Sequence, residues 1–571
     1  MNHRLLFLTL FIFITISTFG QEPIPTSKRA ARGFLSYSNY RQALEEYQKL
    51  WAKDSTNIEY NHSIGLCYIE TNIDKSKAIP YLEWVVNQPK SNPNAWYDLG
   101  RAYALNYRFD DAIEAFSKYT QIIIKDENYI QASRWIEMCQ NAKEFVKHPL
   151  NVTFQNLGAE INSDAPDINA YITSDETFMV FTTKRAGNVG GWLDYDGFLT
   201  SDIMYSTSKS GVWLKPRRLP NTINSAIVEE TVGMSPDGSH LFVYMDNFTA
   251  SGDIYLSVKT GRSFNKLEPL GRNINTKNLE TSACIAPNKK IIFFTTTLPD
   301  TYGGTDIYYS SKLPNGEWGP PVNLGKTINT QYDEEFPYLA PDGKTFYFAS
   351  TGHNSMGGFD IFKSVWNKED MTFTKPVNLG YPINTPENNF TFSITRSGRY
   401  AYVSAFRKEG YGDLDIYRVI LNNVAAPMHF ISGNILHPDS SDFFSNHNTL
   451  RQELLNMNMI LDTMNFTPVT EDSARVEAAH PGFFIHFLKL QNDVAHFPDI
   501  TINVTKPESD NIIGIYRPDK TSGRYVIILP PGKYNLTCKA HGYTPFVKTV
   551  DLPDYESYNE EMTIDIVLKK E

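Results

Sequence analysis

The sequence of 571 residues contains only four cysteines, and they are far apart: Cys67, Cys139, Cys284 and Cys538. No Cys-x-x-Cys pair is present, which excludes a zinc site of the common spacing, and four scattered cysteines do not make a disulfide framework. An excess of positive charge is also missing, since the formal net charge is −11. This balance argues against nucleic acid and anionic membrane surfaces as partners.

Linear motifs of catalysis and nucleotide binding are absent as well. The sequence has no G-x-S-x-G nucleophile elbow, no H-E-x-x-H zinc motif and no Walker A loop. We therefore expect no cofactor and no resident metal, and these absences favour a protein that is not an enzyme.

Long apolar runs are missing after the first 20 residues. The run LLFLTLFIFITI at 5–16 is short for a membrane span, and the small residues Thr18 and Gly20 stand before Gln21. This pattern predicts a cleavable signal peptide over residues 1–20. No cysteine precedes Cys67, so we expect no lipid anchor. The mature chain is expected to be exported, without an integral membrane segment, to the periplasm or the outer membrane, and not to be a lipoprotein.

Residues 27–147 carry a repeat of 34 to 35 residues. The segment WYDLGRAYALNYRFDDAIEAF at 96–116 has its Gly and Tyr spaced like those of an earlier segment, and alanines recur in step at Ala43, Ala78 and Ala112. Small residues at this period allow paired helices to approach closely. The pattern resembles the tetratricopeptide repeat, and that resemblance implies an α-helical solenoid.

A binding face of this solenoid would lie on the first helix of each repeat. Arg32 and Arg101 stand there and would meet a protein partner. The alternative is that they are ordinary solvated side chains, which basic residues on helices usually are.

A longer repeat occupies residues 150–421. Its markers are a short strand that begins with Asp, a tight turn such as SPDG at 235–238, and an Ile-Asn pair in each connector. Four short strands per repeat and five repeats predict a five-bladed β-propeller. The markers resemble the PD40 repeats of TolB-like propellers. The fifth repeat lacks an outer strand, and NVTFQNLG at 151–158 is predicted to supply it, which would remove an exposed edge.

One polar position recurs before the first strand of each repeat. Five residues after each connector Asn stand Asp167, Glu229, Glu280, Glu334 and, in the fifth repeat, Asn389. Such a ring would hold a cation or a cationic side chain near the central channel. The alternative, which we favour, is that each side chain caps backbone N–H groups of its own blade. Propeller glycosidases need an asymmetric set of carboxylates, whereas this ring is quasi-symmetric.

Residues 429–571 form a third region. The segment SGRYVIILPPGKYNLTCKAHGY at 522–543 resembles the carboxypeptidase-regulatory-like domain, which implies a transthyretin-like β-sandwich. About 60 residues, roughly 437–498, interrupt it and contain a helical pattern of leucines (Leu450, Leu454, Leu461).

The order of these regions is similar to that of envelope proteins of type IX secretion and gliding-motility systems. Those proteins end in an OmpA-like domain, which this sequence does not show, so direct peptidoglycan binding is not expected. The resemblance implies a non-enzymatic envelope scaffold or accessory protein with protein partners. The alternative is a protein that binds a small ligand or glycan on the propeller face.

Overall fold

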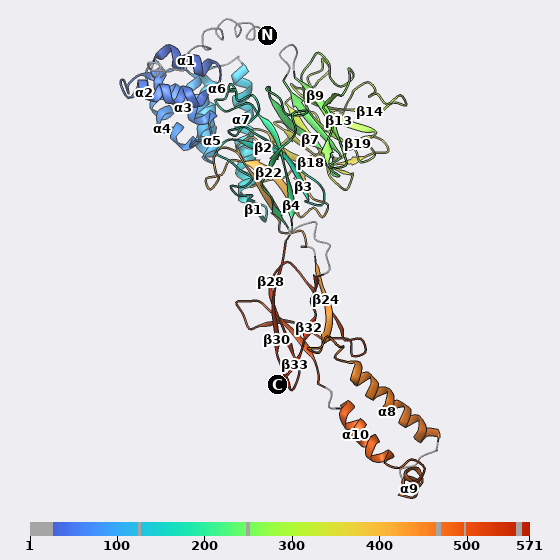
Figure 1. Ribbon diagram of the computed structural model, residues 1–571. Coiled ribbons are helices and arrows are strands. Elements are labelled where there is room, and N and C mark those ends of the chain that lie inside the picture. Colours follow the sequence, from blue (N-terminus) through green and yellow to red (C-terminus); the bar gives the residue numbers. More distant parts are fainter. Residues whose placement is uncertain are drawn as a thin grey trace, which may run out of the picture.

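A computed structural model of the chain is shown in Figure 1. It describes residues 27–123, 127–209, 211–246, 252–426, 428–463, 470–495, 498–554 and 562–571. The expected signal peptide, 1–20, lies outside the described residues. Within the described ranges, no helix is long and apolar enough to cross a membrane. The four cysteines are buried and unpaired.

The chain begins with a helical region. Its helices are α1 (Lys28–Ser36), α2 (Tyr40–Trp51), α3 (Ile58–Glu70), α4 (Ala78–Val86), α5 (Asn94–Leu105), α6 (Phe109–Ile122) and α7 (Glu127–Lys147), with a 3-10 turn at Lys75–Lys77. The first three helices each follow a Ser or Asn whose side chain accepts a backbone N–H of the first turn: Ser27, Asn39 and Asn57. The predicted N-terminal helical region is confirmed.

Two glycines explain why the helices pair closely. A Cβ on Gly65 of α3 would lie 2.6 Å from the Leu82 side chain of α4, and a Cβ on Gly100 of α5 would lie 2.7 Å from the Phe116 ring of α6. No larger residue fits at either place unless the side chain on the neighbouring helix moves. The glycines of the sequence repeat therefore allow α3 to pack closely on α4, and α5 on α6.

The β-rich part that follows, 152–421, has five antiparallel sheets in its described residues. The first contains β2 (Asp167–Ile172), β3 (Phe178–Thr183), β4 (Asp202–Lys209), β5 (Val212–Trp213) and β6 (Arg217–Arg218). The second contains β7 (Glu229–Met234), β8 (His240–Met245), β9 (Asp253–Thr260), β10 (Ser263–Phe264) and β11 (Glu268–Pro269). The third contains β12 (Glu280–Ile285), β13 (Ile291–Thr296), β14 (Asp306–Ser311) and β15 (Val322–Asn323).

The fourth sheet contains β16 (Glu334–Leu339), β17 (Thr345–Ser350), β18 (Asp360–Asn367), β19 (Thr372–Phe373) and β20 (Val377–Asn378). The fifth contains β21 (Ser393–Ile394), β22 (Tyr400–Ala405), β23 (Asp415–Leu421) and, at its outer side, β1 (Val152–Asn156). The innermost strands contact one another in the order β21, β2, β7, β12, β16, and Tyr338 of β16 donates a hydrogen bond to Ile394 O of β21 at 3.3 Å. The sheets thus surround a common centre and have the features of a β-propeller; we call them the five-sheet ring.

The asparagine of each Ile-Asn pair ties a connector to a sheet. Asn329 Oδ1 accepts the backbone N–H of Ile307, and its Nδ2 donates to Ile307 O, both at 2.9 Å. The same double contact joins Asn224 to Ile203, Asn275 to Ile254, Asn384 to Ile361 and Asn162 to Ile416. An amide side chain presents both a donor and an acceptor to a peptide group, which explains this residue type at every connector.

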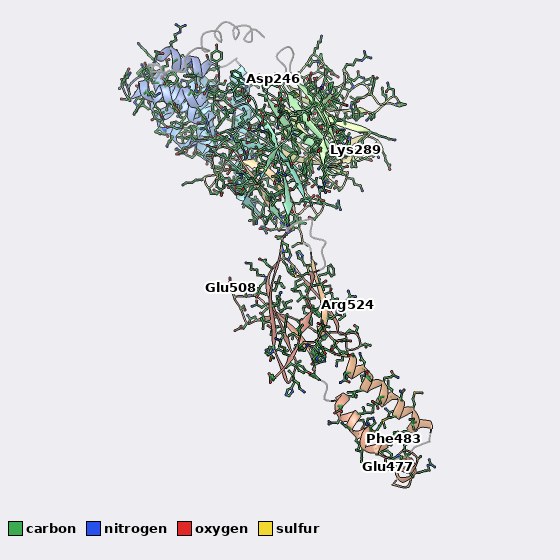
Figure 2. The ribbon with its side chains drawn as sticks, viewed as in Figure 1. Asp246, Lys289, Glu477, Phe483, Glu508 and Arg524 are labelled. Carbon is green, nitrogen blue, oxygen red and sulfur yellow. The ribbon has the colours of Figure 1, made fainter. Side chains whose placement is uncertain are left out.

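The C-terminal region has two small sheets. One contains β24 (His429–Leu436), β27 (Arg524–Leu529), β31 (Met562–Thr563) and β32 (Ile566–Val567). The other contains β25 (Thr501–Thr505), β26 (Ile512–Tyr516), β28 (Gly532–Lys539) and β30 (Phe546–Leu552), while β29 (Tyr543–Thr544) pairs with β33 (Lys569–Lys570). The helices α8 (Ser445–Thr463), α9 (Thr470–Ala479) and α10 (Phe483–Ala495) lie at its far end, with Phe483 packed among them (Figure 2).

The three parts are joined by specific contacts. The helical region packs against loops of the ring, and Arg41 of α2 forms an ion pair with Asp413 at 2.6 Å. The C-terminal region joins the ring through Asp554, whose carboxylate accepts hydrogen bonds from Tyr400 and from Arg399. Arg418 also donates to the Asp554 backbone carbonyl at 2.8 Å. The helical region and the C-terminal region therefore occupy different places on the ring (Figure 1).

Candidate functional site

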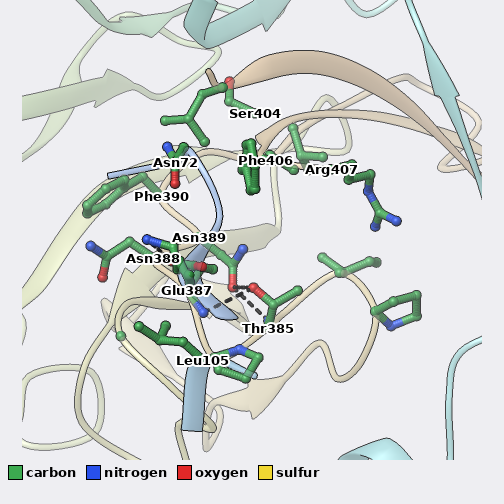
Figure 3. Close-up of a pocket in the computed structure, with 18 of the residues that line it drawn as sticks. Asn72, Leu105, Thr385, Glu387, Asn388, Asn389, Phe390, Ser404, Phe406 and Arg407 are labelled. Atoms are coloured by element: carbon green, nitrogen blue, oxygen red, sulfur yellow. Dashed lines mark hydrogen bonds and ion pairs between the residues drawn. The ribbon is translucent and has the colours of Figure 1, made fainter. Parts of the chain in front are cut away.

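A cavity of about 510 Å³ lies between the helical region and the five-sheet ring. Its walls come from α3 and α5, from the turn before α4, and from the loops of the fourth and fifth sheets (Figure 3). Cavities between two structural units are common sites for ligands, because both units contribute side chains to one enclosed space.

Arg134 of α7 holds the two walls together. Its guanidinium donates to Thr351 O and Gly352 O, each at 2.8 Å, and to His353 O at 3.1 Å. It also lies over the Tyr332 ring, 4.6 Å from the ring centre. A buried cation that satisfies three loop carbonyls fixes the helical region on the ring, and with it the shape of the cavity.

The helical wall of the cavity is charged. Arg101 donates to Glu70 at 2.7 Å, and Lys75 lies 3.5 Å from the carboxylate of Glu387 on the opposite wall. Burial by itself lowers the pKa of Arg101, but the nearby carboxylates, Glu70 first, raise it overall. Burial raises the pKa of Glu387, against the lowering effect of Lys75. The cavity thus holds paired charges rather than an excess of one sign.

The ring wall offers unpaired polar atoms beside aromatic faces. Arg407 stacks on Phe154, with its guanidinium carbon 3.6 Å from the ring centre, and its buried Nε has no hydrogen-bond partner in the described part of the chain. The buried Oγ of Ser404 likewise makes no hydrogen bond to any residue that the structure describes. Both residues line the cavity together with Phe390 and Phe406 (Figure 3). Unsatisfied donors next to apolar rings suit a polar, largely uncharged molecule with a flat face, such as a sugar.

Two of the predicted site residues meet in this cavity. Arg101 and Asn389 both line it. Asn389 Oδ1 accepts the backbone N–H of Thr385 at 2.8 Å, so this side chain also orders its own connector. Arg32, by contrast, is exposed and pairs with Glu59 at 2.6 Å, away from the cavity lining. Contact of Arg32 with a partner stays a prediction.

The four predicted carboxylates begin the innermost strands of four sheets and are fully buried: Asp167, Glu229, Glu280 and Glu334. Each accepts a backbone N–H and a hydroxyl from the Ser or Thr four residues earlier. For Glu334 the donors are the backbone N and the Oγ1 of Thr330, both at 2.8 Å. These are the contacts of the capping alternative, and cation binding at the ring stays a prediction.

The carboxylates differ electrostatically. Asp167 is one methylene shorter than the glutamates, and Arg185 reaches it in an ion pair of 2.5 Å. Burial raises the pKa of Glu229 and of Glu334 to about 7. Among the residues that the structure describes, no three His, Cys, Asp or Glu side chains form a group suited to a metal ion.

Sequence reasoning missed Arg134, Ser404 and Arg407. Arg134 lies in the helical region expected at 27–147, but the sequence around it gives no sign of its contact with three carbonyls more than 200 positions away. Arg407 stands between the end of β22 and the glycine-containing loop KEGYGD at 408–413. Its position beside a loop was the one feature of the sequence that could have indicated a site residue.

A second surface lies on the C-terminal region. Phe430 of β24 and Ile528 of β27 are direct cross-strand partners with exposed side chains. Two more exposed apolar side chains lie two positions away in sequence: Met428, just before β24, and Val526, on β27. The exposed fractions of these four side chains range from 43% for Ile528 to 50% for Phe430 and Met428. Clustered exposed apolar side chains are unusual on a surface without a partner.

Comparison with known proteins gives no family. No family model matches the chain, and no curated protein sequence matches it. TolB from Acinetobacter baumannii is similar in structure at 15% identity and a TM-score of 0.29, over 46% of this chain and 55% of that one. The chain thus spans about half the length of that TolB.

Glycoside hydrolases are also among the similar structures. A glycosyl hydrolase from Bacteroides ovatus has 11% identity and a TM-score of 0.31, over 45% of this chain and 84% of that one. The α-L-arabinanase of Penicillium chrysogenum has 12% identity and a TM-score of 0.27, over 46% and 99%. TM-scores this low carry no argument about ligand or reaction.

The prediction that the chain is not an enzyme is wrong, because it excluded a class of enzyme that occurs among the similar structures. Several of the similar structures are glycoside hydrolases, a class whose catalytic carboxylates come from separate strands and leave no linear motif. The assumed symmetry of the carboxylate ring also fails, because Asp167 is ion-paired, burial raises the pKa of Glu334 to about 7, and Asn389 carries no charge. The missing motifs therefore exclude no glycosidase, and no substrate is assigned.

Proposed function

We propose that this chain is an exported scaffold or accessory protein of the cell envelope, which mediates protein–protein interactions in an outer-membrane-associated secretion or gliding machinery. In this proposal the helical region is a tetratricopeptide-like solenoid, the ring is a five-bladed TolB-like propeller, and the C-terminal region is a transthyretin-like sandwich. Domains of these kinds commonly present binding surfaces.

The observation that carries this proposal is the exposed apolar surface on β24 and β27. Phe430 and Ile528 face solvent side by side, whereas the opposite face of the same strands supplies Ile431 and Ile527 to the core. Removing several such side chains from water stabilises a complex by about 25 cal/mol per Å² of apolar area. A protein partner with an apolar surface would therefore dock here.

The test is in-cell photo-cross-linking of the full chain, comparing Phe430→Ser/Ile528→Ser with the wild type. We expect the variant to lose its cross-links to envelope proteins while its melting temperature stays close to that of the wild type, because both side chains are half exposed. Val365→Ser/Val377→Ser is the matched control, since it removes two exposed valines from the fourth sheet. Equal cross-linking by both double variants and the wild type would refute this docking surface.

The interdomain cavity favours a second function, the binding of a small ligand or glycan. Within the described ranges, Ser404 Oγ and Arg407 Nε form no hydrogen bond, and aromatic side chains line the cavity with them. Ser404→Ala removes one unpaired hydroxyl without breaking any hydrogen bond described within the protein, so a loss of affinity reports on the ligand alone. Thr281→Val is its control, because Thr281 Oγ1 is also buried and unpaired but lies outside the cavity.

Titration calorimetry with neutral oligosaccharides tests this second function. We expect saturable binding that Ser404→Ala weakens by about 1 kcal/mol or more and Thr281→Val leaves unchanged. Product analysis of the same mixtures separates binding from hydrolysis. No heat from any oligosaccharide, or an equal loss in both variants, would count against the cavity.

Export is tested separately. We expect the mature protein to begin at Gln21, to be recovered from the envelope fraction, and to incorporate no palmitate analogue. A labelled band would contradict the expectation of a chain without a lipid anchor.

A further inference from the structure

A second cavity, of about 350 Å³, opens between the outer parts of the first and second sheets. One wall is formed by β3, β4, β6 and the segment between β5 and β6, and the other by the end of β9 with the turn before β10. We call it the basic groove, because the charged side chains that line it are Lys215, Arg217, Lys259 and Arg262.

The basic groove is electrostatically one-sided. Of the residues that the structure describes, four cations and no carboxylate line it, in a chain whose formal net charge is −11. Some cations elsewhere on the ring are paired, as Lys184 is with Asp194 and Asp196. In the described part of the chain, no ion pair is formed by any of the four groove cations. No ion pair within the described ranges therefore offsets the repulsion among these four charges.

An aromatic floor lies under one of these cations. The Nζ of Lys259 is 3.9 Å from the centre of the Phe178 ring, which stacks on Tyr205 with ring centres 5.7 Å apart. Partial burial lowers the pKa of Lys259, and no ion pair with a carboxylate of the described residues offsets it. A cation–π contact offsets only part of that cost.

The ring itself contains a closed counterpart of this position. Lys259 stands six residues after Asp253, which begins β9, and Trp366 stands six residues after Asp360, which begins β18. Trp366 is buried and packs edge-on against Phe293 of the preceding sheet, with ring centres 5.2 Å apart. At this position of the repeat, a buried aromatic side chain can therefore fill the space between two neighbouring sheets. Between the first and second sheets a lysine stands there instead, and the space is open.

We propose that the basic groove binds a small acidic ligand that carries two or more carboxylate or phosphate groups. Arg217 and Arg262, from opposite walls, present guanidinium groups suited to paired oxygens of either kind. Lys215 and Lys259 supply the remaining charge, and the Phe178–Tyr205 pair offers a face to an apolar part of the ligand. This site is separate from the interdomain cavity and from the apolar surface, so it stands whether or not those functions hold.

Calorimetry on the full chain with citrate and with pyrophosphate tests the proposal, and glucose serves as the uncharged reference. We expect saturable binding of one or both anions, weakened at least about tenfold between roughly 50 and 200 mM salt. Tighter binding of citrate assigns the groove to carboxylates, and tighter binding of pyrophosphate assigns it to phosphates.

Three variants locate the binding. Arg217→Gln/Arg262→Gln should weaken it at least about tenfold. Lys344→Gln/Lys375→Gln, which removes the same charge from exposed positions of the fourth sheet, should not. Lys259→Trp should fill the groove as Trp366 fills its counterpart, abolishing binding while the melting temperature is kept. Absence of saturable binding to the wild type, or equal weakening by both double variants, would overturn the proposal.

Discussion

Asn156 donates a hydrogen bond to Asp415 at 2.7 Å, although the two residues are 259 positions apart. The same contact joins Asn323 to Asp306 at 2.8 Å within the third sheet, only 17 positions apart. A bond that is local in one sheet is long-range in the fifth, because its outer strand comes from the chain before the first sheet. The ring is thus closed by side-chain contacts as well as by pairing of β1 with β23.

These two asparagines make a matched pair of mutations. Asn156 Oδ1 also accepts Gly158 N and Asn162 Nδ2, and Asn323 Oδ1 accepts Gly325 N and Asn329 Nδ2. We expect Asn156→Ala and Asn323→Ala each to lower the free energy of unfolding by about 1–3 kcal/mol, because each leaves buried partners unsatisfied. Urea denaturation measures both. An Asn156→Ala variant as stable as the wild type would show that the fifth sheet does not depend on this contact.

The helical region and the β-rich part were predictable from the sequence, because both repeat. Glycines and alanines at a fixed period report helix contacts such as that of Gly100 with Phe116, and the recurring Asn reports a connector tied to its own sheet. The interdomain cavity was not predictable. It joins Arg101 to Asn389, which are 288 positions apart, and such contacts depend on how two finished units dock rather than on local pattern.

The raised pKa of Glu334 makes part of the stability depend on pH. Its carboxyl titrates near 7 in the folded chain, because of burial, and near the ordinary value of 4.5 when unfolded. A group whose folded pKa is raised stabilises the fold at low pH, and this contribution is lost as pH rises from about 4.5 to 7. We expect the wild type to lose more stability over this window than Glu334→Gln does.

Melting temperatures between pH 4.5 and 8 measure this difference. Glutamine can still accept the Thr330 N–H, so the connector should stay closed in the variant. Glu317→Gln, at an exposed position in the third repeat, is the control and should keep the wild-type slope. Parallel curves for wild type and Glu334→Gln would show that this carboxyl does not titrate in the window.

Asp554 sets how the C-terminal region sits on the ring. Its carboxylate contacts Arg399 at 3.3 Å and the hydroxyl of Tyr400. We expect Asp554→Ala to widen the distribution of maximum dimensions in small-angle scattering while ring stability is little changed, since Arg399 also donates to Val424 O. Asp551→Ala, which removes an exposed pair with Lys533, should scatter like the wild type. Identical scattering by all three proteins would show that the Asp554 carboxylate does not fix the C-terminal region on the ring.

Arg134 should decide whether the helical region stays on the ring. Removing its guanidinium takes away the donor that Arg134 supplies to the carbonyls of Thr351 and His353, a loss of about 2–4 kcal/mol, whereas Gly352 O still accepts from Ser355. Alanine is a good helix former, so α7 itself should persist in Arg134→Ala. We therefore expect the loop 351–355 to exchange its amide hydrogens faster while α7 keeps its protection.

Hydrogen exchange followed by mass spectrometry separates this outcome from general unfolding. Arg108→Ala is the control, because Arg108 is exposed and pairs with Asp111 on the same helical region without touching the ring. Ligands of the interdomain cavity should also bind Arg134→Ala more weakly, since one wall has moved. If the loop keeps its wild-type protection in Arg134→Ala, the other contacts between the two units, such as the ion pair of Arg41 with Asp413, suffice to hold them together.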